Sequence, residues 1–335
     1  MRNGIMAVGS WIVDSVKFID TYPTKGNLVS IRSERIGVGG CSHNVLVDLA
    51  RLDCGLPLYA GGCIGADEKG KLSLAECARY GIDAANMHVL EDEYTSYSDV
   101  MSEIGGTSTR TFFHYRGANA CLTEEMVTSC DTQARIFLLG YLLLLDKLDE
   151  ADAEYGVVAA RALDALQKKG YKTAIDVVSE EGDRFRSIVL PCLKYVDYLI
   201  INEVEAGACL GAALRDKEGR IDIQKVKRAA SCLLELGSGS IVAIHFPEGG
   251  VAVSRDGEQC FVPSDMVPAE EIVSAVGAGD AFCAGALYSI HEGYSLKQML
   301  EFANASARFN LKSFDATSGA PALSEIERYL ESRAI

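Results

Sequence analysis

Residues 276–286 read VGAGDAFCAGA, in which three small residues run into an acid and then into an apolar stretch. Gly277 and Gly279 allow a tight turn and let the backbone approach a ligand without an intervening side chain. Apolar residues then recur at helical spacing between positions 281 and 290. The pattern predicts a helix that begins in the glycine turn, with free main-chain N–H groups at its start.

Such a helix start is a ready anion site, because the amides of Gly277, Ala278 and Gly279 and the helix dipole all favour negative charge. Asp280 lies in the first turn, where the dipole keeps a carboxylate ionised. An anion hole beside a carboxylate base suits phosphoryl transfer to an alcohol. For an isolated match, a glycine turn with a capping Asp is the simpler interpretation. A dinucleotide fingerprint is excluded, because Phe282 occupies its third glycine position and too little chain follows.

Length and composition limit the classes of protein that are compatible with the chain. The 335 residues are 48% hydrophobic and 24% charged, which is typical of a globular protein. The chain shows no linker and no internal repeat, so we expect one compact domain over 1–335. A net charge of −15 argues against nucleic acid or a membrane surface as partner. The eleven cysteines contain no C-x-x-C pair, and the histidines have no metal-ligand spacing. We therefore interpret the cysteines as buried thiols of a protein in a reducing compartment, and we expect a cytoplasmic location.

Strand and helix patterns alternate along most of the chain. We expect buried strands at 5–8, 57–62, 135–145, 173–178, 198–201 and 240–245. We expect helices at 44–52, 69–80, 152–168, 224–236 and 296–312, and a last helix that starts with a capping box at 324–327. This alternation is typical of a mainly parallel sheet covered by helices on both faces.

Two segments, about 14–37 and 94–117, interrupt this alternation. Both alternate between polar and apolar residues, the first around a turn cluster at 22–27 and the second around Gly105-Gly106, which resembles a two-residue hairpin turn. They predict a small antiparallel sheet over the carboxyl edge of the main sheet, where ligands bind. Such a sheet functions as a lid, and its exposed edge strands also suit an oligomer contact, so a homodimer through the lid is a second expectation.

These features together resemble the ribokinase-like (PfkB) family of carbohydrate kinases, over roughly 5–321. The C-terminal signature of that family is matched by residues 274–280, SAVGAGD. Its N-terminal glycine signature is matched by 39–44, GGCSHN, and continues through 62–70. Its N-x-x-E element is matched by 202–205, NEVE. The resemblance implies a three-layer α/β/α core with a β lid.

The resemblance implies roles for matching residues on the acceptor side. Asp280 would be the base that accepts the proton of the attacking hydroxyl, beside the anion hole. Asp14, at the end of the first expected strand, would bind sugar hydroxyls, since a carboxylate accepts two such donors. The remaining expected sugar-binding residues are Gly39, Gly40, Asn44, Arg116 and Asn119. A strand-end surface position is the alternative for Arg116, as is an ordinary helix cap for Asn44.

On the nucleotide side, Asn202 and Glu205 would act near the phosphates of ATP. Glu205 would hold Mg²⁺ through a metal-bound water, because Mg²⁺ gives up water reluctantly. The family's nucleotide loop lies at 245–250, where Gly250 is kept but His245 replaces Thr and Pro247 replaces the first Gly. Asn304 stands where the family lines the adenine pocket, although a surface role suits a helical Asn equally well.

Two departures concern the C-terminal signature. Ser274 replaces the usual Asp and Ala275 the usual Thr, in a segment that holds K⁺ in many members. We therefore expect weak or absent activation by K⁺. The leading hypothesis is an ATP-dependent kinase that phosphorylates a hydroxyl of a small sugar. A nucleoside kinase of the same fold and a sugar-binding regulatory relative with weak turnover are the alternatives.

Overall fold

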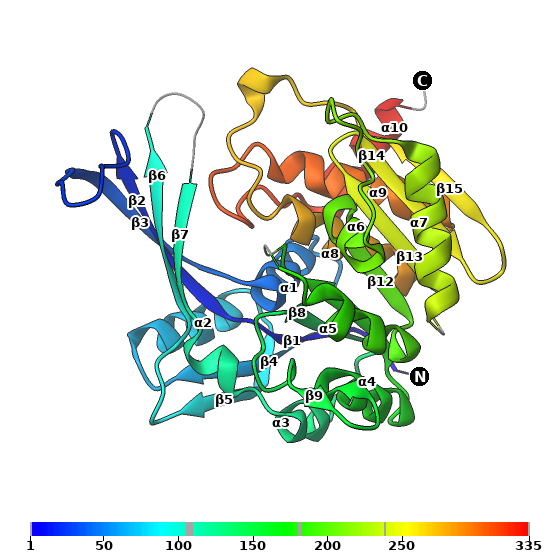
Figure 1. The fold of residues 1–335 in the computed structure, drawn as a ribbon, viewed down its shortest axis with the longest axis horizontal. Coiled ribbons are helices and arrows are strands. Elements are labelled where there is room, and N and C mark those ends of the chain that lie inside the picture. Colours follow the sequence, from blue (N-terminus) through cyan, green and yellow to red (C-terminus); the bar gives the residue numbers. More distant parts are fainter. Residues whose placement is uncertain (1, 105–109, 180–181, 238, 334–335) are drawn as a thin grey trace.

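The computed structural model describes residues 2–104, 110–179, 182–237 and 239–333. A nine-stranded sheet forms its centre, with helices on both faces, and a second sheet stands off one side (Figure 1). In spatial order the large sheet contains β15 (Gln259–Pro263), β14 (Gly249–Ser254), β13 (Ile241–Phe246), β12 (Tyr198–Asn202), β11 (Lys172–Val177), β8 (Ile136–Leu142), β1 (Ile5–Gly9), β4 (Leu58–Gly65) and β5 (Asp83–Leu90). All neighbours from β13 to β5 are parallel, while β14 and β15 add an antiparallel edge. This confirms the expected α/β architecture.

The sheet separates two hydrophobic cores because successive strand residues point to opposite faces. In β8, Phe137 and Leu139 belong to one core, whereas Ile136 and Leu138 belong to the other. The first core is covered by α3 (Glu124–Ser129), α4 (Val158–Lys168), α5 (Phe185–Cys192), α6 (Glu203–Leu210) and α7 (Ile223–Leu236). The second is covered by α1 (Cys41–Arg51), α2 (Glu68–Arg79), α8 (Ala278–Glu292), α9 (Leu296–Asn310) and α10 (Leu323–Arg333).

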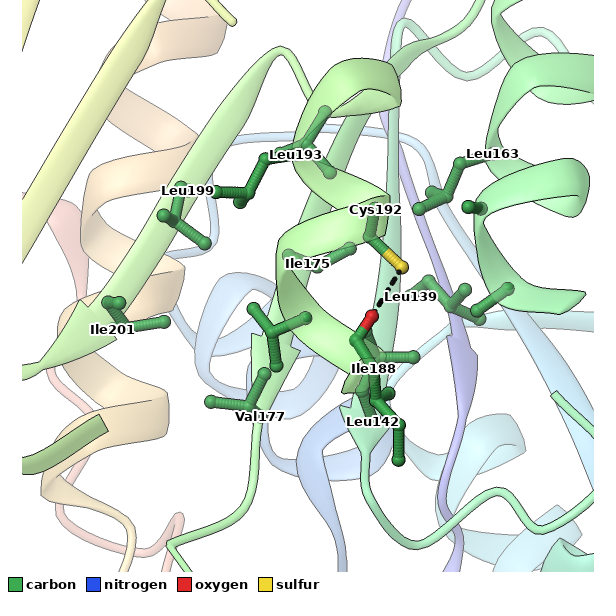
Figure 2. Close-up of a cluster of buried hydrophobic side chains, with 14 of the residues drawn as sticks. Leu139, Leu142, Leu163, Ile175, Val177, Ile188, Cys192, Leu193, Leu199 and Ile201 are labelled. Carbon is green, nitrogen blue, oxygen red and sulfur yellow. Dashed lines mark hydrogen bonds between the residues drawn. The ribbon is translucent and has the colours of Figure 1, made fainter. Parts of the chain in front are cut away.

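Figure 2 shows part of the first core, where α5 lies on strands β8, β11 and β12. Ile175 and Leu139 point from the sheet toward the helix. Cys192 packs among them as a small apolar group, and its thiol donates to the carbonyl of Ile188 at 3.2 Å. The cysteines of the described residues are all free thiols. Most are buried, as expected, but Cys232 is exposed.

The second sheet contains β3 (Ile31–Gly39), β2 (Ile12–Ile19), β6 (Tyr97–Glu103) and β7 (Arg110–Tyr115) in that order. It projects from the body at the left of Figure 1. The outer pairs β2–β3 and β6–β7 are antiparallel, as expected, but the central pair β2–β6 is parallel. The first strands of the two hairpins, β2 and β6, are neighbours at the centre of the sheet and run in the same direction. The expected Gly105-Gly106 turn lies outside the described residues.

Three expected boundaries need correction. The helix expected from position 152 begins at Val158, because Asp152 accepts the amides of Glu154 and Tyr155 in a turn between β9 (Ala151–Asp152) and β10 (Gly156–Val157). The last helix already includes Ser324, so that residue is not its cap. Asp14 lies inside β2 and not at the end of β1, in the segment already expected to form the lid.

The chain enters the large sheet at β1, extends through β4 and β5 to one side, and then returns to β8 on the other side. The carboxyl ends of parallel strands at such a switch point border a crevice where ligands bind in α/β proteins. Near these ends lie Tyr141 on β8, Asp176 on β11, Asn202 on β12 and His245 on β13. Residues far apart in sequence are thereby gathered at one edge.

Candidate active site

Asp280 lies at the first turn of α8 and is only 5% exposed. Its two carboxylate oxygens accept hydrogen bonds from the hydroxyl of Tyr141 at 2.6 Å and from the side-chain amide of Asn44 at 2.8 Å. Burial raises the pKa of Asp280 to about 6, against the lowering effect of these two donors. The carboxylate is therefore held in one orientation and is mostly ionised at neutral pH.

The glycine turn before Asp280 has the geometry that its sequence predicts. Gly277 has a φ of 78°, in the left-handed region that glycine adopts without strain, and it caps α8. Within the described residues, the amides of Gly277 and Gly279 have no main-chain acceptor, as expected for a helix start. The amide of Ala278 instead donates to the carbonyl of Ala275 at 3.3 Å. Two of the three expected amides are thus available to an anion.

A cavity of about 180 Å³ opens on the side of this turn where nucleotide binding is expected. The side chains around it include those of Tyr141, Asp176, Glu205 and His245 together with Asp280. None of its described lining residues is Lys or Arg, so a phosphate chain placed here finds main-chain amides but no basic side chain. A divalent cation is the natural complement to this set of oxygen ligands.

Asn202 and Glu205 form a capping box at the start of α6. The side-chain oxygen of Asn202 accepts the amide of Glu205 at 2.9 Å, and the Glu205 carboxylate accepts the amide of Asn202 at 2.9 Å. The second Glu205 oxygen accepts the Ser179 hydroxyl at 2.7 Å. Burial raises the pKa of Glu205 to about 7. The element therefore caps a helix and also presents a carboxylate to the cavity.

Asp176 is a functional candidate that the sequence reasoning left out. One of its oxygens accepts a hydrogen bond from the thiol of Cys41 at 3.4 Å. The sulfur of Cys41 and one carboxylate oxygen each of Asp176 and Asp280 lie within 4.8 Å of one another. Burial, followed by the charges of Asp280 and Glu205, raises the pKa of Asp176 well above its ordinary value. Its position as the acid of a buried parallel strand just before the carboxyl end was the available signal.

A larger cavity of about 570 Å³ lies on the other side of the turn, between the lid and the body. Val276 lines this cavity while Gly277 lines the first one, so the glycine turn divides them. Asp14 faces the larger cavity, and burial raises the pKa of its carboxyl to about 6. A Cβ on Gly39 would lie 2.8 Å from a carboxylate oxygen of Asp14, so a larger residue here would displace the Asp14 side chain.

His43 is a second residue that the sequence reasoning missed, although it lies inside the quoted glycine signature. It is 2% exposed and lines the larger cavity. Its Nδ1 lies 3.1 Å from the side-chain oxygen of Asn44 and donates to it, since that oxygen only accepts. Burial lowers the pKa of His43, so Nε2 is an unprotonated acceptor, and it has no partner among the described residues.

Arg116 and Asn119 do not lie in either cavity. The guanidinium of Arg116 binds Asp146 at 2.7 Å and the carbonyl of Leu143 at 3.0 Å, so its charge is used at the protein surface. The side-chain oxygen of Asn119 accepts the amide of Trp11 at 3.1 Å beneath the lid. The arginines that line the larger cavity include Arg35 and Arg110 of the lid but not Arg116, so a role of Arg116 in substrate binding stays a prediction.

The expected nucleotide loop forms a hairpin between β13 and β14. His245 packs on Phe282 with ring centroids 4.8 Å apart, and burial lowers its pKa to about 4. A Cβ on Gly250 would meet Leu300 at 3.0 Å, so this glycine permits close helix packing. The side-chain amide of Asn304 donates to the carbonyl of Val262 at 3.1 Å.

On the acceptor side, Gly40 is the N-cap of α1 and has a φ of 90°.

Comparison with known proteins agrees with this arrangement. The family model described as pfkB family carbohydrate kinase matches residues 2–323. The chain belongs to this family. It is 24% identical to the ribokinase of Haemophilus influenzae over 336 residues, covering 99% of each chain. The protein is thus an ATP-dependent carbohydrate kinase.

Solved structures support the fold. The structure of Arabidopsis thaliana ribokinase complexed with ribose and ATP matches with a TM-score of 0.79 and 23% identity, over 99% of both chains. A putative ribokinase II from E. coli in complex with ATP and Mg²⁺ matches with a TM-score of 0.75 and 19% identity, over 98% of this chain and 99% of that one. Among the described residues, no helix has the length and apolar character needed to cross a membrane.

Proposed function

We propose that the protein transfers the γ-phosphoryl group of ATP to a hydroxyl of a small sugar or sugar derivative held between lid and body. The observation that carries this proposal is the position of Asp280, which two hydrogen bonds fix in the smaller cavity, in the turn whose Val276 lines the larger one. The acceptor would lie beside Asp14 and His43, and the phosphates beside the amides of Gly277 and Gly279. The single turn that separates the cavities brings the two substrates into contact.

The proposed reaction follows from this geometry. The acceptor hydroxyl gives its proton to the Asp280 carboxylate as its oxygen bonds to the γ-phosphorus, and the bond from that phosphorus to the bridging oxygen breaks to release ADP. The free amides at the start of α8 stabilise the charge on the transferring group. The lid would exclude water from the acceptor side, so that the phosphoryl group is transferred to the sugar and ATP is not hydrolysed.

Mg²⁺ fits the nucleotide-side cavity, because the carboxylates of this cavity can serve as oxygen ligands. Among the described lining residues, no Lys or Arg balances their negative charge. Glu205 would hold the ion through a bound water. The ion would neutralise charge on the phosphates. The putative ribokinase II complexed with ATP and Mg²⁺ is consistent with this proposal. Because Ser274 has no carboxylate, and its hydroxyl accepts the amide of Val276 at 3.1 Å, we propose that K⁺ activates weakly or not at all.

Release of ADP from a panel of sugars, sugar phosphates and nucleosides, with and without added K⁺, tests this function. We expect turnover with one class of sugar and a change of less than about twofold on adding K⁺. Turnover confined to nucleosides selects the nucleoside kinase alternative. Ligand binding without any turnover selects the regulatory alternative.

The pH profile provides a further prediction. Asp280 accepts a proton only when ionised, so kcat falls as the pH drops below about 6, close to tenfold per pH unit. Tyr141→Phe removes a donor that lowers the pKa of Asp280, so the acidic limb moves to higher pH. Tyr155→Phe is the matched control, because its hydroxyl donates to Asp164 at 2.9 Å outside both cavities. An unchanged limb in Tyr141→Phe contradicts this assignment.

Two expectations about the protein's surroundings remain proposals. The edge strands of the lid, β3 and β7, expose Ile36 and Phe113, at 63% and 51%, and such apolar edges suit a homodimer through the lid. A cytoplasmic location is proposed from the free thiols.

A further inference from the structure

One face of the lid sheet carries two arginines into the acceptor cavity. The strand register places Arg35 beside Val16, and Arg110 in the next row beside Ser102. Because residues paired across a sheet share a face, both arginines lie on the same face as Asp14. The lid residues of this face that line the cavity are Asp14, Val16, Phe18, Arg35, Gly37, Val100, Arg110 and Phe112.

The other charged groups of the cavity already have partners. Glu76 pairs with Arg79 at 3.3 Å. Asp315 accepts the amides of two residues of its own loop, Thr317 at 3.1 Å and Ser318 at 2.7 Å. Arg51 donates to the carbonyl of Ser318 at 3.1 Å and also to that of Ala320. These groups build the wall of the cavity, and among its described lining residues Arg35 and Arg110 are the arginines whose side chains have no hydrogen-bond or ion-pair partner.

Neither lid arginine forms an ion pair within 4 Å among the described residues. Arg35 stacks on the ring of Phe314, with its guanidinium carbon 4.8 Å from the ring centroid, and this leaves its N–H edges free. Arg110 is partly buried, and burial lowers its pKa despite the opposing charge of Asp14. Desolvation of a half-buried guanidinium is unfavourable, and an anion bound beside it would offset this cost beyond the nearby charge of Asp14.

We infer that the acceptor is anionic: it carries a phosphate or carboxylate group, remote from the reacting hydroxyl, that binds Arg110 and Arg35. Both groups match the fork of a guanidinium. Asp14 cannot bind this group and is left for neutral hydroxyls. The cavity of about 570 Å³ lies within the range of drug-sized ligand sites, roughly 300–1,000 Å³, so it has room for a substituted sugar. The inference rests on the proposed function for the position of the acceptor.

Binding measured by calorimetry without ATP tests the inference independently of turnover. The probes are D-ribose and D-ribose 5-phosphate for a phosphate, and D-glucose and D-glucuronate for a carboxylate. We expect one charged probe to bind at least about 10-fold more tightly than its neutral partner, as for hydrogen bonds to a charged group. The pair that shows the preference identifies the anion. Equal affinities in both pairs, or no binding of either charged probe, overturn the inference.

Arg110→Met and Arg35→Met then locate the preference. Each should reduce the ratio of charged to neutral affinity by about 10-fold, and Lys at the same position should restore part of it. A merely structural role would weaken both probes equally and leave this ratio unchanged, which would contradict the assignment. Arg220→Met is the matched control, since that arginine is exposed and pairs with Asp216 at 2.8 Å outside the cavity.

Turnover separates this inference from the proposed function. If the charged probe binds more tightly but no acceptor leads to ADP release, the proposed function is refuted and the anionic ligand is supported. ADP release from neutral sugars, with charged probes bound no better, supports the function and refutes the anionic acceptor.

Discussion

Asp280→Asn lowers kcat by roughly 100- to 10,000-fold and leaves the affinity for ATP within about threefold of the native value, because a base is lost while the glycine turn is kept. The substitution suits the site geometrically. The Asn oxygen can accept the amide of Asn44, and its NH₂ group can donate to the Tyr141 hydroxyl, so both native partners remain bonded. The measurements are ADP release at saturating substrates and calorimetric titration with ATP.

Asp48→Asn is the matched control for this variant. Asp48 is a buried acid of α1, 4% exposed, whose two oxygens have no partner among the described residues. Burial raises the pKa of Asp48 well above the ordinary value, and Asn keeps the size and shape of this side chain. It lines neither substrate cavity, and we expect native turnover. Near-native turnover in Asp280→Asn would end its assignment as the base.

Gly277→Ala has the second large effect. A Cβ at this position would lie 2.4 Å from the carbonyl oxygen of Ala316 and 2.5 Å from its Cα, so backbone must move. The left-handed φ of 78° adds roughly 1–2 kcal/mol of strain for Ala. Movement of the turn displaces the amides that face the phosphate, and loss of one such donor lowers kcat about 100- to 1,000-fold.

Gly81→Ala isolates the two causes. Gly81 has a φ of 67°, but a Cβ there would meet nothing within 4 Å. The control should therefore lose only the strain energy, about 1–2 kcal/mol in urea unfolding, and keep its turnover. If Gly277→Ala also loses stability but no more activity than the control, the turn does not act as an anion hole.

The acceptor cavity shows why some of the site was not predictable. Arg116 follows an expected lid strand, but its guanidinium binds Asp146 and lies in neither cavity. Arg35 and Arg110 have no motif around them, and their shared face depends on the register of four strands from two distant segments. Register is fixed by pairing in three dimensions, and a slip of one residue would turn both side chains away.

The sequence by itself determined the features whose cause is local. Gly277 meets the need for a positive φ, the apolar period after it forms α8, and buried runs such as Ile136–Leu142 form parallel strands. Only the tertiary structure decided what meets Asp280. Tyr141 and Asn44 lie 139 and 236 residues away from it in the chain, and the order of strands in the sheet brings them within hydrogen-bonding distance. Local conformational preference acts over a few residues, whereas a site at a sheet edge depends on how distant strands pair.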